Sequence, residues 1–238
     1  MAGDIVMANL KEYLAHSCLR RLINTRLGGN RCVVRGRGNH LALTRALLTR
    51  VRIAVEGDDN RIEVGEGTRL ANLDILVRGN GARLTIGAGC SIAAGKIKLE
   101  DDCCAVSLGD GTTVEDAYFG AYEGMCVEVG RDCMISEKVG IRSGDMHTLI
   151  DQSTGRRVNP SKSIWIGDHV WLARGVTVLK GVTIGANAVI GAQSLVTDDV
   201  PEDSLAVGSP ARVIRQNVTW DRRRLAVAEG GSTRLGAS

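Results

Sequence analysis

A six-residue repeat is the feature of this chain that most restricts how it can fold. Residues 166–201 divide into six unbroken hexads, IGDHVW, LARGVT, VLKGVT, IGANAV, IGAQSL and VTDDVP. Each hexad opens with an aliphatic residue and carries a small or β-branched residue four positions later. This period fits neither an α-helix nor an ordinary strand. It is typical of a parallel β-helix, in which three short faces each direct one aliphatic side chain to the axis.

The turn residues agree with that fold. Gly, Asn or Asp recurs three positions after the aliphatic residue, in register with the repeat. These residue types accept a positive φ at little steric cost, and a corner repeated on every coil requires such a residue. The pattern therefore predicts sharp corners at positions such as Gly67, Gly89, Gly111, Gly175 and Asn187.

A wider form of the repeat precedes the hexads. The strings VRGRGNHLAL (34–43), VEGDDNRIEV (55–64) and LVRGNGARLTI (76–86) share one pattern, and LEDDCCAVSL (99–108) is a degraded copy. Their spacings are 21, 22 and 22 residues, against 18 for three hexads, so each early coil has one enlarged corner. With strands about 4.8 Å apart, roughly eight coils would form a prism nearly 40 Å long. We predict one all-β domain, a parallel β-helix over residues 32–201.

Both ends of the chain lie outside the repeat. Residues 1–29 carry apolar side chains at i, i+4 steps after Asp4 and are predicted to form an amphipathic helix. This helix would cover the open first coil, and the alternative is attachment to a membrane surface or a partner. Residues 202–238 form a C-terminal segment with a basic tail that we expect to be solvated.

Composition excludes several functions. A net charge of +3 with no basic patch interleaved with aromatics argues against nucleic acid. No long apolar run or signal peptide is visible, so we expect no transmembrane segment and a cytoplasmic location. The seven cysteines include no CxxC pair. Cys90 and Cys133 occupy the small-residue position of the repeat, which favours reduced core residues over metal ligands.

A histidine stands where the repeat breaks. Val129, Ile135 and Ile141 keep the hexad frame, and the next position in it is His147. The frame resumes only at Ile166, after a polar excursion over residues 148–163. Such an interruption is typical of a functional site inserted into a scaffold, and the alternative is a loop with an incidental histidine.

The four histidines leave one candidate general base. None of them shows the close spacing of zinc ligands, and we expect no metal. His169 occupies a corner position of the repeat, which favours a turn residue, whereas His147 does not. An imidazole titrates at about pH 6.5 and is suited to accepting a proton from a hydroxyl or an amine. No GxSxG motif or Cys–His nucleophile is visible, which favours direct transfer.

Several strings resemble a known family. GDMHTLID, TGRRVNP, VGSPARVIR and the run of hexads are similar to the hexapeptide-repeat acyltransferases, a left-handed β-helix family. They are most like the members that O-acetylate capsular, O-antigen and exopolysaccharide sugars. The resemblance covers about 32–215 and is most specific over 143–215. It implies a homotrimer with active sites between neighbouring prisms, acetyl-CoA laid along the coils, and a small-molecule or oligosaccharide acceptor.

The resemblance also implies roles for particular residues. His147 would be the general base, and the backbone N–H near Arg174 would stabilise the thioester oxygen as it becomes anionic. Trp171 would lie near the histidine and the acceptor channel. Either Asp145 or Asp151 would orient the histidine ring, although backbone carbonyls do so in relatives.

The residues expected around acetyl-CoA follow from the same resemblance. Ala173 and Ala192 would line the pantetheine groove, because small residues let an extended arm approach the backbone. The full set of positions is Trp171, Ala173, Arg174, Ala192, Thr197, Arg212 and Arg215. One departure stands out: the family commonly reads VTK where this chain has Val196-Thr197-Asp198. Phosphate binding would then rest on Arg212 and Arg215.

Two other functions remain open at this point. The first is N-acetylation of an amino-sugar nucleotide with the same histidine as base. The second is a non-catalytic β-solenoid scaffold, which would not bind acetyl-CoA. Serine acetyltransferases and sugar nucleotidyltransferases fit poorly, because they carry large domains before the repeat that this chain lacks.

Overall fold

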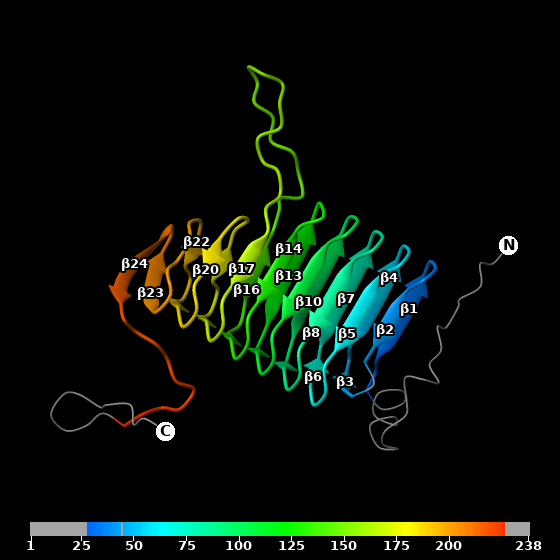
Figure 1. The fold of residues 1–238 in the computed structure, drawn as a ribbon, viewed down its shortest axis with the longest axis horizontal. Coiled ribbons are helices and arrows are strands. Elements are labelled where there is room, and N and C mark those ends of the chain that lie inside the picture. The colour runs from blue at the N-terminus through cyan, green and yellow to red at the C-terminus, as the bar shows by residue number, and fades with distance from the viewer. Residues whose placement is uncertain (1–27, 44, 227–238) are drawn as a thin grey trace.

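The chain forms a three-sided prism of stacked coils (Figure 1). The structure is a computed structural model and describes residues 28–43 and 45–226. The helix expected over residues 1–29 lies almost wholly outside the described residues. Within the described ranges no helix is long and apolar enough to cross a membrane.

Each face of the prism is one β-sheet, which we call faces A, B and C. Face A contains β1 (Arg31–Arg35), β4 (Arg52–Glu56), β7 (Leu73–Arg78), β10 (Gly95–Glu100), β13 (Ala117–Tyr122), β16 (Val139–Arg142), β19 (Thr177–Val178) and β22 (Leu195–Val196). Face B contains β2 (His40–Ala42), β5 (Arg61–Val64), β8 (Arg83–Ile86), β11 (Ala105–Leu108), β14 (Cys126–Val129), β17 (Ile164–Ile166) and β20 (Thr183–Ile184). Face C contains β3 (Leu47–Thr49), β6 (Arg69–Ala71), β9 (Ser91–Ile92), β12 (Thr113–Val114), β15 (Met134–Ile135), β18 (Trp171–Leu172), β21 (Val189–Ile190), β23 (Ser204–Gly208) and β24 (Ala211–Gln216).

The strand register confirms the repeat lengths and a β-solenoid of eight coils. On face A, Arg31 pairs with Arg52, 21 residues on, and Arg52 pairs with Asp74, 22 residues on. After the loop that follows β16, Thr177 pairs with Leu195 at the hexad spacing of 18 residues. The chain therefore changes from wide coils to narrow coils between β16 and β19.

The core is a set of stacked side-chain columns. On face A, Ile53, Ile75, Ile97, Phe119 and Ile141 stand in direct register and are at most 4% exposed. Burying an aliphatic or aromatic side chain of this size stabilises the fold by about 1.5–3 kcal/mol.

The predicted cysteine positions are confirmed as core. Cys90 and Cys133 are at most 1% exposed, as is Cys104. Burial raises the pKa of the Cys104 and Cys133 thiols to about 11. Because the thiolate is the nucleophilic form, these thiols are unreactive at neutral pH.

The corners have the predicted backbone conformation. Gly67, Gly175 and Asn187 have φ values of 74°, 73° and 60°, and His169 occupies the same kind of corner at 55°. In the wide coils an asparagine also braces the interior. Asn60 is 1% exposed, and its side chain bonds the Gly79 carbonyl at 3.0 Å and the Ala82 amide at 2.9 Å.

The solenoid continues beyond the predicted end at residue 201. Pro201 ends the hexad pattern, yet Leu205 of β23 pairs in parallel with Val189 and completes the eighth coil. Strand β24 then returns antiparallel to β23. The tail expected to be solvated packs on the prism as far as Arg222, because Trp220 buries its ring there and is only 8% exposed.

Candidate functional site

A projecting loop leaves the prism where face A narrows (Figure 1). Strand β13 has six residues, β16 four and β19 two. The chain leaves the coil at Ser143, whose amide donates to the Gly120 carbonyl at 2.9 Å and whose hydroxyl accepts the Tyr122 amide at 3.0 Å. The preceding wide coil therefore fixes the direction in which the loop departs.

The loop is a hydrogen-bonded arm over residues 144–163. Ile150 and Arg157 form an antiparallel bridge, and the Val158 amide donates to the Leu149 carbonyl at 2.9 Å. At the tip, Asp151 accepts the Ser153 hydroxyl at 2.6 Å. That bond, together with amides of the turn, lowers the pKa of Asp151 to about 2. The Asp151 carboxylate therefore stabilises the tip of the arm.

Asn159 organises the root of the arm around His147. It is 5% exposed, and its Oδ1 accepts the Leu149 amide at 2.7 Å. Its Nδ2 donates to the His147 carbonyl at 2.8 Å and to Asp145 Oδ2 at 2.8 Å. One amide group thus bonds the Asp145 side chain, the His147 carbonyl and the Leu149 amide.

Lys180 ties this root to the next coil. It follows β19, and its Nζ donates to the Asp145 carboxylate and, at 3.1 Å, to the Asn159 carbonyl. The ammonium lowers the pKa of Asp145, with a further contribution from Asn159. Asp145 is therefore an ionised anchor of the arm, and its contact with His147 runs through Asn159.

A second ion pair holds the other branch of the arm. Glu123 lies in the turn between β13 and β14 and accepts from the Arg157 guanidinium at 2.6 Å. It also accepts the Ser161 amide at 3.1 Å. The Arg157 guanidinium lowers the pKa of Glu123, so the pair remains charged at neutral pH.

The His147 side chain is exposed at the edge between faces A and B. Within the described part of the chain its ring makes no hydrogen bond to Asp145, Asp151 or any other residue. The carboxylates considered for orienting the ring are thus engaged elsewhere. No group of three or more potential metal ligands clusters in the described ranges.

The second group of expected residues lies at the edge between faces C and A. Ala173 and Arg174 follow β18, and Ala192 occupies the equivalent place one coil later. Among the described residues, the amides of Arg174 and Ala192 donate to no acceptor. At the edge between faces B and C, the Arg131 amide is instead capped by Asp168 of the next coil, at 2.7 Å. Two free donors therefore line the C–A edge, as oxyanion and pantetheine contacts would require.

A β-bulge brings the two expected phosphate-binding arginines to one face. Arg212 and Arg215 are three residues apart, which would normally put their side chains on opposite sides of a strand. The register shifts between Leu205 and Ala206, so Arg212 lies opposite Val207 and Arg215 opposite Leu205. The extra residue is Ile214, which is 62% exposed. A bulge realigns side chains in this way.

Asp198 already forms an ion pair with one of these arginines, Arg212. Arg212 NH1 lies 3.0 Å from Asp198 Oδ2, and both side chains are more than 60% exposed. Thr197 Oγ1 donates to the same carboxylate oxygen at 3.0 Å. The residue that replaces the expected basic contact is therefore the partner of Arg212, and an anionic ligand would have to displace it.

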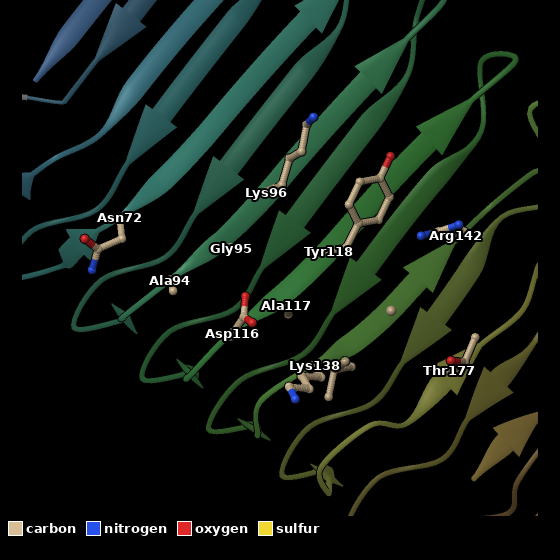
Figure 2. A pocket seen from close by; sticks show the side chains of 12 residues that line it. Asn72, Ala94, Gly95, Lys96, Asp116, Ala117, Tyr118, Lys138, Arg142 and Thr177 are labelled. Carbon is tan, nitrogen blue, oxygen red and sulfur yellow. The ribbon is translucent and has the colours of Figure 1, made fainter. Parts of the chain in front are cut away.

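A shallow groove of about 560 Å³ crosses face A (Figure 2). Small residues of β10, β13 and β16 form its floor, and Lys96, Lys138 and Arg142 line it against a single carboxylate, Asp116. The Arg142 guanidinium lies 4.6 Å from the centre of the Tyr118 ring. The groove therefore combines an aromatic ring with an excess of positive charge.

The expected site residues lie on two different edges of the prism. The structure does not bring them together within one chain: His147 lies at the A–B edge, and Ala173, Arg174 and Ala192 lie at the C–A edge. Sequence reasoning missed Asn159, Lys180 and Glu123. The Asn-Pro pair that ends the polar excursion was the available signal for Asn159.

Comparison with known proteins identifies relatives of the chain. Residues 163–198 match the family described as bacterial transferase hexapeptide (six repeats). The polysialic acid O-acetyltransferase of Escherichia coli O1:K1 is 38% identical over 49% of this chain and 38% of its own length. That of Neisseria meningitidis is 30% identical over 53% of this chain and 59% of its own length. The matches thus span less than two thirds of either relative.

Two solved structures have the same fold over nearly their whole length. The polysialic acid-specific acetyltransferase NeuO superimposes with a TM-score of 0.77 at 29% identity, over 83% of this chain and 91% of that one. The polysialic acid O-acetyltransferase OatWY gives 0.75 at 28% identity, over 82% and 92%.

Proposed function

We propose that this chain, a hexapeptide-repeat transferase homologous to the polysialic acid O-acetyltransferases, transfers an acetyl group from acetyl-CoA to a hydroxyl of an acidic sugar chain. The observation that carries the proposal is the root of the arm. There a buried asparagine and two ion pairs hold an exposed histidine at the break in the repeat. The narrow coils stack without such a network, so the stacking of the solenoid does not require it.

The reaction follows from the residues in place. His147 would accept the proton of the attacking hydroxyl, whose oxygen forms the new ester bond to the acetyl carbon. The carbonyl oxygen becomes anionic and would be stabilised by the free amide of Arg174. The bond to sulfur then breaks, and the imidazolium would return its proton to the departing CoA thiolate.

Acetyl-CoA would lie along the C–A edge. The free amides of Arg174 and Ala192 offer donors to the pantetheine arm, and the Ala173 and Ala192 side chains leave room for it. Arg212 and Arg215 project from one side of β24 and supply positive charge for the phosphates. Thr197 and Trp171 are the remaining residues that we expect around acetyl-CoA.

An acidic acceptor is supported by the groove on face A. The related enzymes carry polysialic acid in their names, and this groove has three cationic side chains against one carboxylate. Its upper end lies at Arg142, one residue before the arm departs. An acceptor chain bound there would therefore reach toward His147.

The active site would be shared between copies of the chain. A homotrimer would bring the His147 edge of one prism to the C–A edge of the next, which neither edge can do within one chain. Three side chains of the arm, Leu149, Ile150 and Val158, are between 57% and 61% exposed and are suited to packing on a neighbour. We further propose a left-handed coil, from the resemblance to the hexapeptide-repeat acyltransferases, and a cytoplasmic site of action.

Acetyl transfer to oligomers of sialic acid tests the function directly. We expect purified protein to consume acetyl-CoA in their presence and to form a product that mild alkali hydrolyses, because esters are labile under conditions in which amides survive. A stable product would instead indicate N-acetylation. No transfer, with no thermal shift on adding CoA, would contradict the proposal.

Complementation between two inactive variants tests the shared site. His147→Ala and Arg174→Pro remove groups on different edges, the second by deleting the free amide. If the site is shared, refolding the two together should restore about one quarter of wild-type activity, since that fraction of interfaces in random trimers is intact. Co-refolding without recovery would place the whole site in one chain.

A further inference from the structure

The chain does not leave the prism after its last strand. Residues 217–223, which we call the C-terminal strap, run back along the edge between faces B and C. Val218 donates to the Asp203 carbonyl at 3.0 Å. Further on, Arg222 bonds Asp132 Oδ1 at 2.9 Å and Thr113 Oγ1 at 2.8 Å. The strap therefore reaches from the eighth coil to the fourth.

Trp220 is the fixed point of the strap. Its ring stacks on His169 with centroids 4.1 Å apart and planes inclined by 6°. Its Nε1 donates to the His169 carbonyl at 2.7 Å. It also packs against Trp171, with centroids 6.3 Å apart and a tilt of 52°.

Trp171 depends on this contact for its orientation. Its Nε1 is buried and has no acceptor among the described residues. Packing, and not a hydrogen bond, therefore holds its ring, and Trp220 is the ring that contacts it. Without the strap, the Trp171 indole would be free to turn its N–H toward water.

His169 closes the strap through both of its ring nitrogens. Its Nδ1 lies 2.8 Å from Asp132 Oδ2, and its Nε2 lies 3.0 Å from the Trp220 carbonyl. A carboxylate and a carbonyl only accept hydrogen bonds, so each ring nitrogen is placed to donate. The hydrogen bonds of His169 and Arg222 lower the pKa of Asp132 despite its partial burial. Asp132 is thus an ionised partner of the ring.

We propose that the C-terminal strap is a positioning element of the active site, in which Trp220, latched by His169, fixes the orientation of Trp171. This rests on the proposed function, in which Trp171 is one of the residues around acetyl-CoA. The latch consists of the stacked rings of Trp220 and His169 and of two hydrogen bonds between the same two residues. Opening of the strap would release the Trp171 ring.

Kinetics of Trp220→Ala test the positioning role. We expect kcat to fall about tenfold, with KM for acetyl-CoA and the molar mass in solution unchanged. Trp220→Phe keeps a ring on His169 and should recover most of the rate. Arg223→Ala, on the same strap, is the matched control and should match the wild type. Wild-type kinetics for Trp220→Ala would overturn the proposal, as would an equal loss in Trp220→Phe and Arg223→Ala.

A fluorescence measurement tests the latch without any turnover. In a Trp165→Phe background the two remaining indoles are Trp171 and Trp220. We expect acrylamide to quench this parent protein weakly, because the closed strap covers the Trp171 ring. His169→Asn, which tolerates the corner conformation but loses the ring on which Trp220 stacks, should be quenched more strongly. Equal quenching of the two proteins would overturn the latch, and it would do so even if the acetyl acceptor had been misassigned.

Discussion

The wide and narrow coils of the prism do different work. In the wide coils, side chains bond along the stack, as in the Arg35–Glu56 pair and the Asn39–Asn60 contact. The narrow coils carry few such bonds, and most of the residues expected around acetyl-CoA lie on them. The arm with His147 departs at the junction. The difference suggests that the wide coils supply rigidity, whereas the narrow coils leave backbone groups available for a ligand.

Replacing the histidine at the junction should give the largest effect and test this division. We expect His147→Ala to lower kcat by about 10²–10⁴-fold, because a general base contributes that much. Affinity for acetyl-CoA and the Tm should change little, since the ring bonds to no described residue. Steady-state kinetics and a thermal melt measure both. His40→Ala, an exposed histidine of a wide coil, is the control, and equal losses in both variants would refute the assignment.

A change within the wide coils should lower the stability of the protein and leave its kcat unchanged. Asn60→Ala removes a buried side chain that bonds neighbouring backbone groups, and we expect the free energy of unfolding to fall by about 1–3 kcal/mol. The kcat at a temperature where the protein is folded should not change. Asn80→Ala removes an exposed asparagine side chain of the wide coils and should lower the free energy of unfolding by less than about 0.5 kcal/mol. Denaturant titration measures the stability of both variants. A loss of activity without a loss of stability in Asn60→Ala would contradict the assignment of rigidity to the wide coils.

Asn159 should behave as part of the junction and not as part of the core. We expect Asn159→Ala to lower kcat by up to about 10²-fold, because the backbone beside His147 loses its anchor and the base is misplaced. Ser153→Ala, at the tip of the same arm, should leave kcat near the wild-type value. Were both variants equally impaired, the arm as a whole and not its root would matter.

The smallest effect is expected at the C-terminal arginines. Removing the carboxylate in Asp198→Asn frees Arg212 and should lower KM for acetyl-CoA by about two- to fivefold, the size typical of an exposed ion pair. The gain should shrink as salt increases. Asp199→Asn makes the same change of charge one residue away and serves as the control. An unchanged KM in Asp198→Asn would place the CoA phosphates elsewhere.

The repeat and the break could be predicted because each depends on local pattern. A hexad with one aliphatic residue permits few folds, and His147 stands out where that residue is missing. Contacts between distant segments could not be predicted in this way. Nothing near Asn159 in the sequence indicates that Lys180 meets its carbonyl, and nothing in the basic tail indicates that Trp220 stacks on His169. For the same reason His169, which the sequence predicts only as a turn residue, also contacts two other segments through Asp132 and Trp220.

The strap also changes how the stack can come apart. In a solenoid each coil contacts only its neighbours, so coils at an open end can fray one at a time. Arg222 ties the chain beyond the eighth coil to Thr113 and Asp132, in the fourth and fifth. Opening the last coil while the strap is closed would strain that tie. The C-terminal coils should therefore unfold as one cooperative unit, and their amides should exchange with solvent at a common rate.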